Sequence, residues 1–362
     1  MEIKNSHIIA RLWPLLVPIV AVTVIALIGM SSGPVIQRVV LTGLVNLILV
    51  VGLYIFVGNS GIMSFGHIAF MAIGAYTSAL LTIPTGSKAV LMSKLPDFLA
   101  TAQMSPVSAA IIGGLAAALV ALIFALPVMR LTGISAGIAS FCLLAIVQNV
   151  FSNTPRLFGQ SGTIVGIPTV ITLPWALAAG VCAIVIAYLF QRSRLGQLLR
   201  ASRDDEVAAR GLGIAIVPQR VAAFVLSAFV VGVGGAAYAQ MVGAFSPKAF
   251  FVATTFITIA MLVIGGTRSL LGAVLGVIAI SICAEGLRNL EGGMNLGFFV
   301  TPALPGLREM GMAAIMIIAL IFRPRGITNG REARWPWGRH EAERPQMASV
   351  ARETAVKAAS AR

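Results

Sequence analysis

Long runs without a charged residue dominate the sequence. No Asp, Glu, Lys or Arg occurs within residues 12–37, 39–87, 98–129, 131–155, 157–191, 221–247, 249–267 and 269–284. Each run holds a stretch close to the ~17–25 residues that a helix needs to cross the apolar core of a bilayer. Backbone polar groups in lipid must be satisfied within their own segment, so such runs predict helices. The pattern therefore predicts an all-α, polytopic membrane protein.

About ten transmembrane or re-entrant helices follow from this pattern. We expect them near residues 13–30, 39–57, 64–83, 106–129, 131–152, 170–190, 218–239, 252–266, 268–286 and 303–322. The first is expected to be a retained span, because its apolar stretch is longer than the ~7–15 residues of a signal peptide. Segment 64–83 is rich in Gly and Ser, so a broken or re-entrant helix is an alternative there to a full crossing.

The composition excludes a soluble domain and adds an orientation. Hydrophobic residues make up 58% of the chain and charged residues only 10%, against about 25% charged in soluble proteins. The net charge of +14 does not indicate nucleic acid, because the basic residues lie at the ends of apolar runs. If all ten segments cross the membrane, nineteen Lys and Arg residues lie on the same side as the N-terminus and seven lie on the opposite side. Since cytoplasmic flanks are enriched in Lys and Arg, both termini are predicted to be cytoplasmic.

Two further features complete this outline. Residues 328–362 are rich in Arg, Glu and Ala and lack an apolar stripe, so a disordered, basic cytoplasmic tail is predicted there. Cys142, Cys182 and Cys283 stand singly in apolar runs. Without Cys-x-x-Cys or Cys/His spacing they are expected to be small buried apolar residues rather than disulfide or metal-binding residues.

One long charged segment, residues 191–220, interrupts the apolar pattern. Three leucines within 195–199 have the spacing of one helical face. The acidic run 204–206 then places negative charge at the start of a second short helix, where the helix dipole favours it. Gly211 and Gly213 can end that helix. The segment is thus predicted to form two short helices at the cytoplasmic surface, and a helix lying on the membrane is one interpretation of them.

Four segments form a joint pattern along the chain. They are Ser193-Arg194-Leu195-Gly196 with Arg200-Ala201 and Glu206-x-Ala208-Ala209-x-x-x-Gly213-Ile214, then Gly58-Asn-Ser-Gly61-Ile-Met-Ser64-Phe-Gly66-His67, then Val263-Ile-Gly265-Gly266 with Gly272 and Gly276, and Arg323-Pro324-Arg325-Gly326. Together these segments resemble the branched-chain amino acid (LivH/LivM) permease family of ABC importers, and the first resembles its EAA coupling loop. The resemblance covers roughly residues 40–327. It implies a transmembrane permease domain over 1–327.

Within that family the chain is similar to the LivM type, by its length, its extra N-terminal span and the segment Leu126-Pro-Val-Met-Arg130-Leu-Thr-Gly133. It departs from the family pattern at Thr132, at Ile134-Ser135 and at 158–162. These positions are expected to face the translocation route. The resemblance implies a branched-chain or related amino acid as the solute. Because of these departures, urea, amides or aromatic acids are alternatives.

The resemblance also implies partners. They are a second, LivH-type permease, two cytoplasmic ATPase subunits and a periplasmic solute-binding protein, with membrane lipid around the spans in a bacterial inner membrane. The chain contains no Gly-x-x-x-x-Gly-Lys-Ser/Thr phosphate loop, so we expect it to be non-catalytic, to bind no cofactor and to leave ATP to its partners. A secondary carrier or channel is less favoured because central carboxylates are missing. A membrane-embedded enzyme is less favoured still.

The resemblance assigns ATPase coupling to one set of loop residues: Leu195, Gly196, Arg200, Ala201, Asp204, Glu206, Ala208, Ala209 and Gly213. On this expectation the residues that pack in an ATPase groove are Leu198, Ala201, Ala208, Ala209 and Gly213. The charged side chains, including Arg203, would bind at the rim of that groove.

Polar residues inside the spans are candidates for the solute route, because burying them in lipid is costly. They are Asn46, Ser64, His67, Gln148 and Asn149. For Asn and Gln an interhelical hydrogen bond is the favoured alternative. For His67 it is a structural role that fixes the turn of 61–66, where Gly58, Gly61 and Gly66 are expected to let the backbone bend. Glu285 is expected to reach water or pair with Arg288.

Overall fold

The computed structural model describes residues 2–91, 96–154, 162–291, 306–323, 326–330 and 332. The chain divides into two units, Leu15–Glu332 and a second made of Met1–Pro14 with Ala333–Arg362. The helices from α2 to α15 and the candidate sites lie in the first unit. Most of the predicted disordered tail lies outside the described residues, so that prediction stays open.

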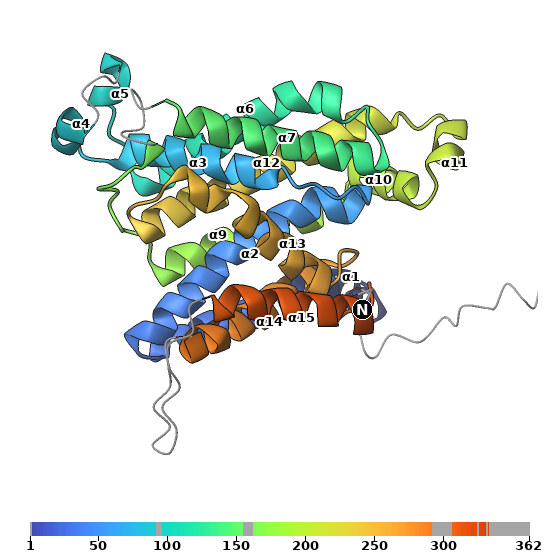
Figure 1. The fold of residues 1–362 in the computed structure, drawn as a ribbon. Helices are drawn as coiled ribbons and strands as arrows, with labels where there is room; N and C mark the ends of the chain where they lie inside the picture. Colours follow the sequence, from blue (N-terminus) through green and yellow to red (C-terminus); the bar gives the residue numbers. More distant parts are fainter. Residues whose placement is uncertain are drawn as a thin grey trace, which may run out of the picture. The chain divides into compact units, whose positions relative to one another are not determined.

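The regular secondary structure of the described residues is helical. The one β contact among them is an isolated bridge between Ile164 and Phe245. The elements are α1 (Glu2–Ser31), α2 (Pro34–Ser60), α3 (His67–Thr82), α4 (Thr85–Leu91), α5 (Asp97–Thr101), α6 (Pro106–Val128), α7 (Gly133–Ser152), α9 (Leu173–Arg192), α10 (Arg194–Asp204), α11 (Glu206–Gly211), α12 (Ile216–Val242), the 3₁₀ helix η2 (Pro247–Phe250), α13 (Val252–Gly265), α14 (Leu270–Glu291) and α15 (Leu307–Phe322). The all-α prediction is confirmed (Figure 1).

The predicted spans correspond to helices of the structure. Among the described residues, eight helices are long and apolar enough to cross a membrane, and α3 and the Met310–Ala319 part of α15 are shorter apolar helices. The helices begin and end where the sequence allows. Pro34 and Pro106 occupy first turns, where a missing N–H costs nothing. Gly61 and Gly243 end α2 and α12 in the left-handed conformation.

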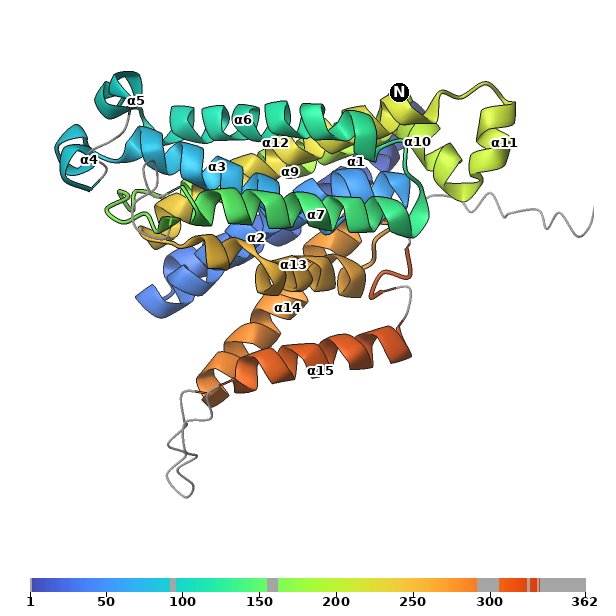
Figure 2. The same ribbon diagram turned by 45° about the horizontal axis from the view of Figure 1, so that its top comes forward.

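Two ends of the bundle are distinct. The short helices α10 and α11 lie together at one end, and α4 and α5 lie at the opposite end (Figures 1 and 2). The pair α4–α5 was not among the predicted elements. Lys88 ties it together, because its buried ammonium donates to the carbonyl oxygens of Leu99, at 3.1 Å, and of Ala102. Burial lowers the pKa of Lys88.

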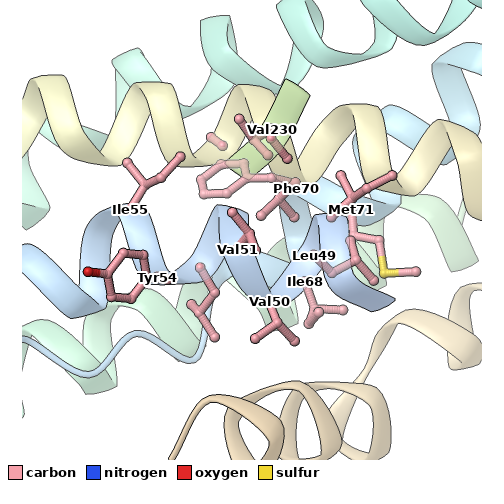
Figure 3. Packing of buried hydrophobic residues seen from close by; sticks show 14 of the residues in the cluster. Leu49, Val50, Val51, Tyr54, Ile55, Ile68, Phe70, Met71 and Val230 are labelled. Atoms are coloured by element: carbon pink, nitrogen blue, oxygen red, sulfur yellow. The ribbon is translucent and has the colours of Figure 1, made fainter. Parts of the chain in front are cut away.

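The core of the bundle forms where α12 packs against α2, α3 and α6. Figure 3 shows side chains of α2, α3 and α12 in this core, with Leu49, Phe70 and Val230 among them. Glycine lets the helices come close. A Cβ added to Gly74 of α3 would lie 2.0 Å from the carbonyl oxygen of Gly232 in α12, and this backbone atom cannot move aside. Small residues at such crossings are typical of membrane helices.

Replacing Gly74 with alanine is expected to lower the free energy of unfolding by about 1–3 kcal/mol, because the added methyl group overpacks a backbone contact. The measurement is thermal unfolding of the purified chain in detergent. The matched control is Gly86→Ala, where an added Cβ meets no atom within 4 Å. Equal melting temperatures for the two variants would refute the close approach of α3 and α12.

Segment 64–83 does not form one continuous helix. The chain leaves α2 at Gly61 with φ of 72°, runs as non-helical backbone to Gly66, and enters α3 at His67. With 16 residues, α3 is about 24 Å long, which is shorter than a full crossing. Residues 67–82 form one unbroken helix, and the non-helical stretch lies before it, at 61–66. The choice between a full crossing and a re-entrant helix stays a prediction. The expected bend occurs at Gly61 but not at Gly58, which stays helical because α2 continues to Ser60.

Candidate functional site

Helix α10 is built into the surface of its own chain. Ser193 caps its N-terminus by accepting a hydrogen bond from the Gly196 N–H at 3.2 Å. Leu199 is completely buried. Gly196 lies so close to the preceding helix that an added Cβ would sit 2.1 Å from the Phe190 carbonyl oxygen. Gly196 therefore lets α10 pack closely against the end of α9, and its assignment to ATPase coupling stays a prediction.

Helix α11 is defined by a side-chain cap. Asp205 accepts hydrogen bonds from the N–H groups of Val207 and Ala208, both at 2.9 Å. The predicted acidic start is thus confirmed, with Asp205 as the capping residue and Asp204 exposed at the end of α10. Gly213 follows the helix with φ of 79°, a conformation that favours glycine. Two short helices are present, as the sequence predicted.

Arg200 and Arg203 make hydrogen bonds to α2 of their own chain. Arg200 donates from Nε to Asn59 Oδ1 at 2.7 Å and from Nη2 to the Tyr54 hydroxyl at 3.0 Å. Arg203 donates to the Gly58 carbonyl oxygen. Burial lowers the pKa of Arg203, and repulsion from other arginines adds to this effect. Both guanidinium groups thus have partners on α2 within the chain, and their contact with the rim of an ATPase groove stays a prediction.

Glu206 likewise binds its own chain. It forms ion pairs with Arg210 at 2.6 Å and with Arg220, at the start of α12, at 2.9 Å. The Arg220 residue is 3% exposed, and among the described residues its Nε and Nη1 have no partner. Burial alone would raise the pKa of Glu206, but hydrogen bonds from both arginines outweigh it and hold this pKa below its usual value. Glu206 therefore fixes α11 to α12, and its contact with the rim of an ATPase groove stays a prediction.

The loop of α10 and α11 exposes large apolar side chains among its charged ones. Val207 is 82% exposed and Leu212 is 81% exposed, and Ala208 and Gly213 are exposed beside them. We call Val207, Ala208 and Leu212 the apolar tip. Leu195, Leu198 and Ala201 are exposed on α10. Ala209 is buried against its own chain, contrary to the expectation that it enters a groove.

Sequence reasoning missed Val207 and Leu212 as the most exposed apolar side chains of the loop. A signal was present, because each is a large apolar residue in a short, otherwise small or charged segment. A burial pattern cannot be read from a helix as short as α11. For the residues of the set taken over from the family, a direct role in coupling stays a prediction.

Of the predicted route residues, Ser64 and His67 come together. His67 Nδ1 lies 2.7 Å from Ser64 Oγ, and both residues are buried. The imidazole is surrounded by the rings of Phe56, Phe70 and Phe224 at 5.2–5.8 Å. Its Nε2 is buried and has no hydrogen-bond partner among the described residues. His67 thus fixes the turn before α3, as the structural alternative predicted.

A small cavity lies beside this pair. Its volume is about 10 Å³, which is about the space that one water needs. Its lining includes Thr255 and Thr258 of α13. The other route candidates do not gather there. Asn46 and Gln148 are half-buried on α2 and α7. Asn149 is exposed and accepts a hydrogen bond from Asn153.

An open apolar groove of about 630 Å³ runs along the non-helical segment 61–65. Its other walls are the first turns of α7, including Ile134 and Phe141, and Phe256 of α13. Ile134 is 84% exposed. This is one of the positions at which the sequence departs from the family pattern. Segment 158–162, another departure, lies outside the described residues except for Gly162.

Two smaller predictions have opposite outcomes. Glu285 pairs with Arg288 at 2.7 Å, as expected. The cysteines are not buried: Cys142 and Cys182 are exposed and Cys283 is half-exposed. That prediction was wrong because apolar surface in a membrane protein can face lipid instead of protein. Within the part of the chain that the structure describes, no group of three or more His, Cys, Asp or Glu could hold a metal ion.

Comparison with known proteins agrees with this architecture. The family model for the branched-chain amino acid transport system permease component matches residues 35–322. The chain is 26% identical over 318 residues to the high-affinity branched-chain amino acid transport system permease protein LivM of Escherichia coli strain K12, covering 78% of this chain and 68% of that protein. It is 25% identical to the LivM protein of Salmonella typhimurium strain LT2 over the same shares. The chain is a multi-pass membrane protein and belongs to the branched-chain amino acid permease family.

Proposed function

We propose that this chain is one of two permease subunits of an ABC importer, with α10 and α11 as its coupling loop. The observation that carries the proposal is the apolar tip, which projects from a loop whose Arg200, Arg203 and Glu206 are held by the chain itself. Large exposed apolar side chains on a rigid support are typical of a protein contact. A rigid support is also what a loop needs in order to pass motion to the spans.

The proposed partners follow from what the chain lacks and from its two distinct ends. No phosphate-loop sequence occurs in it, so two separate ATPase subunits are proposed to hydrolyse ATP at the α10–α11 end. A periplasmic solute-binding protein would deliver solute at the α4–α5 end. The chain would lie in a bacterial inner membrane with both termini in the cytoplasm.

The solute route is proposed to run between this chain and a LivH-type second permease. The groove along 61–65 is a suitable half of such a route, because it is open and sits beside the break between α2 and α3. Its walls are apolar side chains such as Ile134 and Phe256. An apolar wall suits the side chain of a branched-chain amino acid better than urea, which has no apolar part.

A mechanism follows from the anchoring of the loop. Movement of the ATPases would pull on the apolar tip, and Glu206 would carry that movement to α12 through Arg220. Arg200 and Arg203 would carry it to the end of α2. Because segment 61–67 follows α2 directly, a tilt of α2 would shift the wall of the groove and the Ser64–His67 pair.

The test is reconstitution of the chain with its ATPases, second permease and binding protein in proteoliposomes. Uptake of leucine, isoleucine or valine should require ATP and all the subunits. A panel with urea, a short amide and an aromatic acid distinguishes the solutes. Uptake by this chain alone, without ATP, would favour a secondary carrier or channel and overturn the proposal.

A further inference from the structure

The described residues after α15 form a strap over the turn between α13 and α14. We call residues 326–330 with Glu332 the C-terminal strap. The Ile327 N–H donates to the Ile264 carbonyl oxygen at 2.8 Å, and the Thr328 N–H donates to that of Gly265 at 3.2 Å. These carbonyl groups belong to the last turn of α13, which leaves its acceptors unpaired. The strap is therefore part of the structure that ends α13.

Glu332 extends the strap to the start of α14. Its Oε1 accepts a hydrogen bond from the Leu270 N–H at 2.9 Å and another from Gln191 Nε2 at 3.3 Å. A carboxylate at a helix N-terminus is stabilised by the free N–H groups and by the helix dipole. Glu332 Oε2 is buried and has no partner among the described residues. The carboxylate is thus held inside the protein and is not a surface group of the tail.

Tyr54 joins Glu332 to the coupling loop. Its hydroxyl lies 3.4 Å from Glu332 Oε1 and 2.9 Å from Gln191 Oε1, and it can donate to one of them at a time. The same hydroxyl accepts a hydrogen bond from Arg200 Nη2 at 3.0 Å. Figure 3 shows the Tyr54 hydroxyl pointing away from the other labelled side chains of the core. A continuous polar chain therefore runs from the strap through a buried tyrosine to α10.

We propose that Glu332 is a positioning residue for energy coupling: through Tyr54 and Arg200 it holds α10 to the turn between α13 and α14. Displacement of the coupling loop then moves α13 together with α2. Helix α13 carries Phe256 of the groove and Thr255 and Thr258 of the small cavity. The strap thereby gives the loop a second connection to the proposed route. This inference rests on the proposed function.

The test compares Glu332→Ala, Tyr54→Phe and the double variant in the complete reconstituted complex. The measurement is the number of solute molecules taken up per ATP hydrolysed. Each single variant is expected to lower this ratio at least about fivefold, the lower end of typical coupling effects. The double variant is expected to lose no more than the larger single loss, because both residues act in one chain of contacts. Glu285→Gln, at the far end of α14, is the control and should keep the ratio.

A second measurement needs only the full-length chain. Ser202 of α10 is buried, so a cysteine at 202, with Cys142, Cys182 and Cys283 replaced by alanine, should react slowly with a maleimide in detergent. Glu332→Ala is expected to raise the labelling rate at least about fivefold by loosening α10, whereas Glu285→Gln should not. An unchanged labelling rate, or an unchanged uptake ratio in a working complex, overturns the positioning role. If the wild-type complex shows no ATP-dependent uptake, the proposed function is refuted instead. The labelling rates at position 202 then test only whether Glu332 holds α10 in place.

Discussion

Replacing Val207 and Leu212 with aspartate is expected to abolish ATP-driven uptake while the chain still folds and inserts. Both side chains are more than 80% exposed, so the changes should alter the free energy of unfolding by no more than about 0.5 kcal/mol. In the complex, each carboxylate would be buried in an apolar contact. Loss of a central apolar contact costs about 2 kcal/mol or more, so the double variant should lose well over 100-fold in affinity for the ATPase subunits.

The measurement is co-purification of the ATPase subunits with the permease, followed by uptake in proteoliposomes. Ser87→Asp is the control, because it adds one carboxylate to an exposed position at the opposite end of the bundle. It should keep the ATPases bound. If the Val207 and Leu212 variant keeps them as well, the apolar tip is not the docking surface, although the fold would stand.

The change Glu206→Gln is expected to have the second largest effect, this time on the chain itself. It removes the charge that pairs with Arg220, whose side chain is only 4% exposed and whose other nitrogens have no partner among the described residues. A hydrogen bond between charged groups contributes about 1.5–3 kcal/mol, and the loss should appear as a lower melting temperature. Uptake should fall too, because α11 would no longer be fixed to α12.

Glu285→Gln is the matched control for this change. It breaks an ion pair with Arg288, whose side chain is 50% exposed, so the cost should be about 0–1 kcal/mol. The pKa of Glu206 is lowered in the folded chain, so its contribution is present above the usual pKa of a glutamate and is lost as pH falls through the lowered value. The variant should therefore differ from wild type equally between about pH 6 and 8. A difference that grows with pH across that range would contradict the ion-pair explanation.

For the charged segment 191–220, the sequence pattern predicted the helices but not the contacts of their side chains. It predicted two short helices between residues 191 and 220, and the structure has them as α10 and α11. It did not predict that Arg200, Arg203 and Glu206 turn inward, because a charged side chain on a short helix is normally solvated. The end of α2, about 140 positions away, holds the two arginines, and the start of α12 supplies Arg220 as a second partner of Glu206 besides Arg210.

The polar residues of the spans show the same limit. Ser64 and His67 are three positions apart, and their contact is a local property of the turn before α3. Asn46 lies on α2, and Gln148 and Asn149 lie on α7. Their burial depends on which helix faces which neighbour. The groove along 61–65 was equally out of reach, because α7 and α13 approach that segment only in the folded bundle.

The apolar runs and the motifs are sufficient to predict the class of protein, the approximate places of its helices and its family. Apolar runs of this length have no stable alternative to helices in lipid, so the pattern alone is sufficient. The tertiary structure decided which charged residues are occupied and which apolar ones are left exposed. It also brought Glu332, far along the chain, to Tyr54 and α10. Such contacts join residues separated by more than a hundred positions, and no local periodicity records them.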